Sequence, residues 1–215
     1  LVVTDIFGAT SNAQVTITAT NQAPTANAGT NATGVVGFNV ALDGTASSDP
    51  EGDALTYAWN IVTAPPGSAA TLTGGTTATP SYVPDVPGTY LINLTVTDFY
   101  GATGNAQVTI TALTPAAMGT ILTNQAVTAV AGLPPGQFNG RGNQNSMTNL
   151  MNRILDALQA NDLALARNLT IDAIGRTDGC ALRGTPDKKA GKDWITDCGG
   201  QALVYTPLAE SLQYL

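Results

Sequence analysis

Apolar and polar residues alternate through the first half of the chain. Between residues 21 and 112, apolar side chains occupy every second position of four short runs, at 38–42, 57–61, 90–96 and 108–110. Asn and Thr fill most of the positions between them. A period of two means that one face of each strand is buried and the other meets water. Turn-forming residues separate the runs, so the pattern predicts an immunoglobulin-like β-sandwich with Trp59 in its core.

After Thr114 the spacing becomes helical. We predict a short helix over 125–131, and a longer one that begins after Asn145-Ser146. A further helix begins at the cap Asn161-Asp162 and ends near Gly175. A brief helical turn over 193–198 precedes a last helix, and these three or four short helices indicate a small antiparallel bundle. The apolar stripes that support the second and the last helix are Met147, Leu150, Met151, Ile154, Leu155 and Leu158, and Val204, Tyr205, Leu208 and Leu212.

An internal repeat sets the domain organisation. Residues 1–19 are identical to residues 94–112 at 15 of 19 positions, at a constant offset of 93. A repeat of that period indicates an array of self-contained modules. We therefore predict that residues 1–20 are the terminal hairpin of a preceding repeat, that 21–113 form a complete sandwich, and that 114–215 form a C-terminal helical domain. Two strands alone make no stable sandwich, so either upstream residues or a neighbouring chain would complete the first unit.

The first half resembles the PKD (polycystic-kidney-disease) repeat over residues 21–112. The motifs that carry the resemblance occur in order along the chain: Ala26-Asn27-Ala28-Gly29, Leu42-Asp43-Gly44, Asp49-Pro50-Glu51-Gly52-Asp53, Tyr57-Ala58-Trp59, Pro87-Gly88-Thr89-Tyr90 and Val96-Thr97-Asp98. One departure is that Asn60-Ile61-Val62 follows Trp59, where typical members have Asp-Phe-Gly-Asp-Gly. In this departure the chain resembles the subgroup of PKD repeats that is common in long bacterial surface proteins. The resemblance implies an immunoglobulin-like fold and an extracellular spacer or adhesive module.

The second half resembles a small helical module at the C-termini of secreted bacterial and archaeal proteins that contain PKD repeats. The segments that carry this resemblance are 143–149, 177–180, 186–188 and 193–198. The repeated terminal position of such modules suggests a role in capping, anchoring or assembly.

One acidic turn is the candidate metal site. Asp49, Glu51 and Asp53 alternate around Gly52, and hard carboxylate oxygens at such spacing suit Ca²⁺. Asp98, at the end of its strand, could approach the same pole, and Asn21 could add an amide oxygen from the junction between repeats. In the resembled family, calcium sometimes stiffens this junction. The alternative is a solvated turn that binds no ion, and the twelve-residue EF-hand loop is missing.

Two cysteines, Cys180 and Cys198, are the only ones in the chain. In a chain rich in Thr and Asn, a lone pair favours one structural disulfide over two free thiols. Closing a loop of that length would stabilise the helical domain by about 3 kcal/mol. The predicted fold is therefore a multidomain β + α chain, an immunoglobulin-like sandwich followed by a small, disulfide-pinned helical bundle.

Composition argues against several classes of function. The net charge is −7 with no cluster of Lys or Arg, which disfavours nucleic-acid binding, and no apolar run is long enough to span a bilayer. Histidine is absent, so a Ser-His-Asp triad is impossible. Three acids on one turn point the same way rather than across a cleft, as a glycosidase would need. We therefore expect no enzyme.

Two hypotheses of function remain. The first is a structural or adhesive protein, outside the cell or on its surface, which ends a repeat array and assembles with other copies of itself into a filament or fibre. The alternative is an accessory region of a secreted hydrolase that binds polysaccharide or protein. Aromatic side chains that could stack on sugars are Trp59, Tyr82, Tyr90, Trp194 and Tyr205, although the alternation predicts that Trp59 and Tyr90 are buried.

Overall fold

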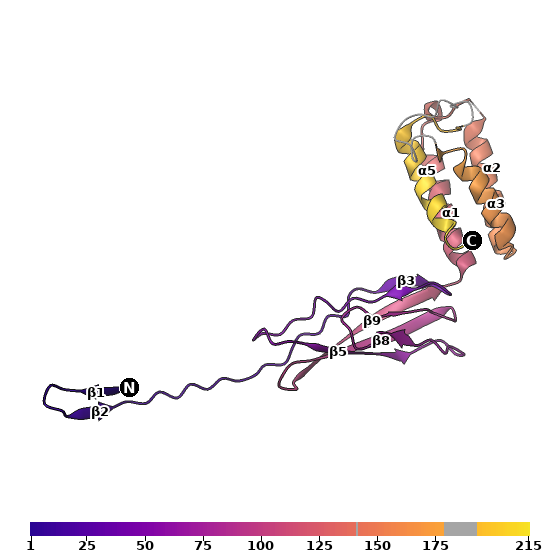
Figure 1. Cartoon of the computed structure of the whole chain (residues 1–215). Coiled ribbons are helices and arrows are strands. Elements are labelled where there is room, and N and C mark those ends of the chain that lie inside the picture. The colour runs from indigo at the N-terminus through magenta and orange to yellow at the C-terminus, as the bar shows by residue number, and fades with distance from the viewer. Residues whose placement is uncertain (141, 179–192) are drawn as a thin grey trace.

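The computed structural model describes residues 1–140, 142–178 and 193–215. Figure 1 shows a small N-terminal hairpin, an extended connection, a β-sandwich and a group of helices, in that order along the chain. Among the described residues, no helix combines the length and the apolar character that crossing a bilayer demands.

The sandwich consists of two sheets. The larger has the strand order β3 (Ala32–Val35), β9 (Thr103–Leu113), β8 (Gly88–Thr97) and β5 (Thr56–Thr63). Its β5–β8 and β8–β9 pairs are antiparallel, whereas β3 runs parallel to β9. The smaller sheet has the order β4 (Val40–Ala41), β7 (Ser81–Tyr82) and β6 (Leu72–Thr73). The predicted immunoglobulin-like sandwich is confirmed.

Alternation along β8 builds the core as the sequence predicts. Tyr90, Ile92, Leu94 and Val96 are fully buried, and the residues between them are half-buried. Trp59 is buried on β5 and its indole N–H donates to the Thr77 carbonyl at 3.1 Å. The predicted run at 38–42 forms only the two-residue strand β4, because Gly37 takes a positive φ of 84° and turns the chain before Phe38.

The sandwich has two ends, which we call the linker pole and the helix pole. At the linker pole lie the turns 48–53 and 98–102, and there the backbone of Thr25 pairs with that of Ser48. At the helix pole lie the turns 36–38 and 84–88 and the end of β9. The Val36 N–H donates to the Leu113 carbonyl at 2.9 Å, which fixes the first of these turns beside the point where the chain leaves the sandwich.

The N-terminal hairpin, β1 (Val2–Thr4) and β2 (Thr10–Asn12), reproduces the end of the β8–β9 hairpin. Val2 pairs with Asn12 and Thr4 with Thr10, which is the register of β8 and β9 shifted by 93 residues. Residues 13–19 form no strand, although their equivalents belong to β9. Figure 1 shows them as part of an extended connection that leads to the sandwich.

Helices α1 (Pro115–Gly132), α2 (Asn143–Gln159), α3 (Leu163–Ile174) and α5 (Cys198–Ser211) pack around one apolar core, with a 3₁₀ turn at Pro135–Gln137. Met147 and Met151 are buried in that core, and Asp162 caps α3 by accepting from the Leu165 N–H at 2.9 Å, as predicted. The short helix predicted over 125–131 is wrong in length, because it is the second half of an 18-residue helix. Thr114 caps this helix and Pro115 occupies its first turn.

The helical turn predicted over 193–198 is also wrong. Ile195 forms an antiparallel bridge with Phe138, and the Thr196 N–H donates to the Gln137 carbonyl at 2.8 Å. These contacts hold the segment extended until Asp197, which caps α5 through the Gly200 N–H at 2.8 Å. Cys180 lies outside the described residues, so its disulfide with Cys198 stays a prediction.

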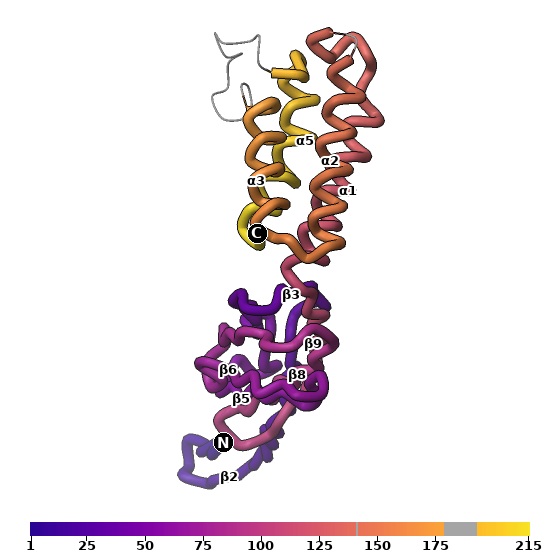
Figure 2. The backbone as a smooth tube through the Cα atoms, turned by 90° about the vertical axis from the view of Figure 1, so that its right-hand side faces the viewer, coloured from indigo at the N-terminus to yellow at the C-terminus, as the bar shows by residue number. Residues whose placement is uncertain are grey.

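The helices adjoin the helix pole of the sandwich (Figure 2). Only Thr114 separates the end of β9 from the start of α1. The chain also returns to this pole at its C-terminus, where the rings of Tyr214 and Phe38 meet edge to face at a centroid distance of 5.1 Å. A short connection and an aromatic contact therefore join the two domains.

Candidate functional site

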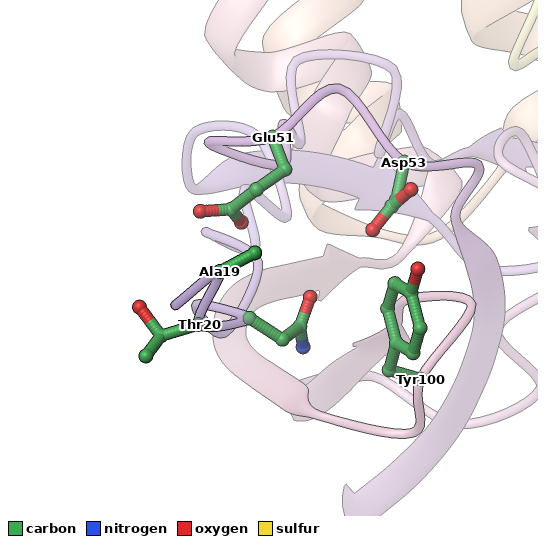
Figure 3. A pocket seen from close by; sticks show the side chains of 6 residues that line it. Ala19, Thr20, Glu51, Asp53 and Tyr100 are labelled. Carbon is green, nitrogen blue, oxygen red and sulfur yellow. The ribbon is translucent and has the colours of Figure 1, made fainter. Parts of the chain in front are cut away.

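A pocket of about 340 Å³ lies at the linker pole of the sandwich. Figure 3 shows its walls, which come from three separate segments of the chain. The connection supplies Ala19, Thr20 and Asn21, the acidic turn supplies Glu51 and Asp53, and the β8–β9 turn supplies Tyr100. The pocket therefore marks the place where the connection from the N-terminal hairpin reaches the sandwich.

Side-chain hydrogen bonds fasten the connection to this pole. The Asn21 amide N–H donates to Asp98 Oδ2 at 2.6 Å. The backbone and side-chain N–H groups of Gln22 donate to the two Glu51 carboxylate oxygens at 3.2 and 2.8 Å. Two consecutive residues of the connection are thus held by two turns of the sandwich, and we call these bonds the linker latch.

The acidic turn is organised by the Asp49 side chain. Asp49 Oδ1 accepts from the backbone N–H groups of Glu51 and Asp53, both at 3.0 Å, and Gly52 takes a φ of 82°. The other oxygens, Asp49 Oδ2 and Asp53 Oδ2, are shielded from solvent and accept no hydrogen bond. Two shielded carboxylate oxygens without donors leave the pole with unsatisfied negative charge.

The carboxylates at this pole differ in their electrostatic surroundings. Desolvation raises the pKa of Asp53, and the nearby carboxylates of Asp49, Asp98 and Glu51 raise it further. The pKa of Asp98 is instead lowered, first by the hydrogen bond from Asn21 and then by backbone N–H groups of its own turn. The pole therefore holds one well-stabilised carboxylate and one that is poorly stabilised.

The five predicted metal ligands are brought to one pole but do not form a ready-made site. Across residues 1–140, 142–178 and 193–215, no three Asp, Glu, His or Cys side chains converge as a metal site requires. Asn21 and Asp98 bond to each other, and Glu51 is engaged by Gln22. Asp49 Oδ2 and Asp53 Oδ2 are the oxygens that a cation could satisfy. The calcium site stays a prediction.

The aromatic residues predicted as sugar platforms form no exposed surface together. Trp59, Tyr82 and Tyr90 are buried, and Trp194 is half-buried with the Arg176 guanidinium 4.1 Å from its ring centroid. The exposed aromatic pair of the sandwich is instead Phe99 and Tyr100 in the β8–β9 turn, which are 78% and 71% exposed.

Sequence reasoning missed Gln22, Phe99 and Tyr100 as residues of this pole. A signal for the last two was present in the repeat, because Ile6 and Phe7 stand at the equivalent positions of the N-terminal hairpin. Both copies of the turn therefore carry two large apolar side chains at the tip.

The comparisons with known proteins bear on the sandwich. Residues 28–112 match the family described as the K319L-like PKD domain, and this match does not extend into the helices. No curated protein matches the chain.

Several solved structures are similar to the sandwich. The PKD1 domain of Vibrio anguillarum Epp is 29% identical, with 45% of this chain and 100% of that chain covered and a TM-score of 0.33. The PKD domain of human KIAA0319 is 19% identical, with 48% and 93% covered and a TM-score of 0.37. A nucleoside hydrolase-related hypothetical protein from Saccharophagus degradans is 22% identical, with a TM-score of 0.39. The match covers 43% of this chain and only 26% of that one.

Proposed function

We propose that this protein, whose residues 28–112 form a PKD domain, is a non-catalytic structural or adhesive module of an extracellular or cell-surface repeat array. The helical domain would follow the array, and the N-terminal hairpin would belong to the module before the sandwich. The observation that carries this proposal is the difference in burial between the two copies of the hairpin.

The N-terminal hairpin exposes side chains that its copy buries. Leu1 and Val3 are 85% and 56% exposed, whereas Leu94 and Val96 are both 0% exposed. The same holds on the second strand, where Val15 and Ile17 are 83% and 85% exposed and their equivalents in β9 are buried. Burying a Val, Leu or Ile side chain stabilises by about 1.5–3 kcal/mol, so covering these four would contribute roughly 6–12 kcal/mol. A driving force of that size supports a partner that completes the sandwich.

A preceding module is the cover that these positions fit. The sandwich of residues 21–113 already holds its own hairpin, 94–112, so a second copy of the chain could accept residues 1–19 only by exchange. A preceding module that lacks its last hairpin would accept them without displacing anything. Exchange between copies is the route to filament assembly in this proposal, and it would make assembly dependent on concentration.

The repeat permits a direct experiment. Placing a second copy of residues 21–93 before Leu1 rebuilds a complete module with the native junction, because residue 93 is followed by the equivalent of residue 94. Amide hydrogen exchange of residues 1–19 should then slow by about a hundredfold or more, as expected for strands in a folded core. The matched control carries Val15→Asp, which places a charge at a core position and should keep the exchange fast.

Sedimentation of the two forms separates the routes of assembly. If the unextended chain associates with rising concentration and the extended protein does not, the exposed hairpin drives contact between copies. If exchange of residues 1–19 stays fast in the extended protein, the hairpin is not the end of a PKD module and the proposed function is wrong.

The second candidate function is an accessory binding region of a secreted hydrolase. Its specific support is the exposed pair Phe99–Tyr100, whose rings meet edge to face at 5.2 Å. Such a pair could stack on a polysaccharide. Calorimetric titration with soluble polysaccharides, and loss of the signal in Tyr100→Ala, would favour this candidate over the first.

A further inference from the structure

We infer that Phe99 and Tyr100 form the docking surface for the preceding module, and that the turn equivalent to 36–38 of that module packs against them. This inference rests on the proposed function, since it names the contact by which consecutive modules would join. Successive modules would then contact each other through a packed interface and would not be joined by a flexible linker alone.

The register of the repeat places that turn beside the pocket. In the complete sandwich the Val36 N–H donates to the Leu113 carbonyl at 2.9 Å, which holds the turn 36–38 against the end of β9. At an offset of 93, the residue equivalent to Leu113 is Thr20. Thr20 lines the same pocket as Tyr100. Figure 3 shows both side chains among those that line the pocket. A preceding module with this register would therefore carry its turn to the wall that Tyr100 forms.

The linker latch leaves no free residues between the end of the preceding module and the sandwich. The preceding module ends its last strand at the equivalent of Leu113, which is Thr20, and the next residue, Asn21, is bonded to Asp98 at 2.6 Å. Gln22 is held by Glu51 immediately afterwards. A module that ends one residue before a fixed point must lie against the pole that fixes it.

The helix pole shows how such a junction is filled. There a single residue, Thr114, separates β9 from the helical domain. Phe38, in the turn equivalent to the proposed one, meets Tyr214 of that domain at a centroid distance of 5.1 Å. The turn at 36–38 therefore already presents an aromatic ring to the domain that follows the sandwich, and Tyr100 offers a matching ring to the module that precedes it.

The apolar side chains at the tips of both turns are exposed, as residues of an interface between modules would be in a single module. Phe99 and Tyr100 are 78% and 71% exposed, and the equivalent Ile6 and Phe7 are 92% and 89% exposed. Large apolar side chains at both turn tips have no role in the core of their own module. A contact between consecutive modules would give both pairs of side chains the same role, as an interface.

The test uses the extended protein, with residues 21–93 repeated before Leu1. In that protein, amide exchange of residues 99–101 should slow by about tenfold relative to the unextended chain, as a packed contact protects the turn. Tyr100→Ala should remove this protection, and small-angle X-ray scattering should show a broader range of angles between the modules. Val62→Ala is the matched control, because Val62 is an exposed apolar residue of β5, outside the linker pole.

The outcomes distinguish this inference from the proposed function. If residues 1–19 become protected but 99–101 exchange as fast as before, the modules exist without the proposed contact and the inference is overturned. If the shape of the Tyr100→Ala protein equals that of the parent, the inference is overturned as well. If residues 1–19 gain no protection, the proposed function is wrong, and the inference, which rests on it, is wrong as well.

Discussion

Two neighbouring tyrosines in the sandwich core should respond in opposite ways to loss of their hydroxyl groups. Tyr90 and Tyr82 are 0% and 1% exposed, with ring centroids 5.4 Å apart. The Tyr90 hydroxyl lies 2.9 Å from the Val86 carbonyl and 3.0 Å from Asp85 Oδ1, and it accepts from the Val86 N–H at 3.2 Å. The Tyr82 hydroxyl is buried without any hydrogen-bond partner.

These surroundings set the expected magnitudes. Tyr90→Phe removes the hydrogen bonds that the hydroxyl makes with the half-buried Val86 backbone and the exposed Asp85 carboxylate, so it should lower the free energy of unfolding by about 0.5–1.5 kcal/mol. Tyr82→Phe removes a buried hydroxyl that has no partner, so it should leave stability unchanged or raise it by roughly 1 kcal/mol. Because both substitutions delete one oxygen from a fully buried ring, packing losses cancel in the comparison.

Urea unfolding followed by Trp59 fluorescence measures the difference. All variants would carry Trp194→Phe, so that the remaining tryptophan reports only on the sandwich and not on the helices. With a slope of about 1–3 kcal/mol per molar urea, a loss of about 1 kcal/mol moves the midpoint by roughly 0.5 M. Equal losses for the two variants, or a larger loss for Tyr82→Phe, would refute the assignment of hydrogen-bonding roles.

Three further predictions follow from single contacts. The hydrogen bond from Ser68, and next that from the Ala69 N–H, lower the pKa of Asp85 to about 2. The ionised carboxylate therefore stabilises the fold fully above pH 3.8, and this stabilisation is lost as the pH falls through about 2. Asp85→Asn should make the urea midpoint depend less on pH between about pH 4 and 2, and an unchanged pH dependence would contradict this. Millimolar Ca²⁺ should stabilise the sandwich by roughly 1–2 kcal/mol, and Asp53→Asn should abolish the effect; a thermal midpoint that is the same in Ca²⁺ and in EDTA would overturn the predicted calcium site. Gly104→Ala should cost at least about 2 kcal/mol, because its Cβ would lie 2.1 Å from the Pro24 carbonyl oxygen; unfolding at the parent midpoint would show that β9 can move away.

The strands could be predicted because their burial is local and periodic. Each inward residue of β8 faces the core and each outward residue meets solvent, so the sequence carries the period directly. The first half of α1 carries no such signal. Its buried positions there are Gly119, Leu122 and Thr123, and Leu122 is the one large apolar residue among them, which is too few to make a stripe. The prediction therefore recovered only the part of the helix that contains Ala126 and Val130.

The extended segment before α5 could not be predicted from nearby residues. Ile195 is held by Phe138, and Thr196 by Gln137, at separations of more than fifty residues. The linker latch is similar, since Asn21 and Asp98 are 77 residues apart and Gln22 and Glu51 are 29 apart. The predicted end of a strand placed Asp98 near the acidic turn, and the junction between repeats placed Asn21 there, but only the fold decides which donor meets which carboxylate.

The two hairpins separate what the local sequence determines from what the fold determines. Asp5 Oδ1 accepts from the Phe7 and Ala9 N–H groups at 2.9 Å each, and Asp98 Oδ1 accepts from the equivalent groups of Tyr100 and Ala102 at 2.8 and 2.9 Å. The turn and the register are therefore the same with and without a surrounding sandwich. Pairing beyond the turn is lost in the N-terminal copy, because residues 13–19 have neither the first half of β8 nor β3 beside them. A module that receives this hairpin would meet two strands already aligned by their turn, so the entropy of setting the register is spent before the contact forms.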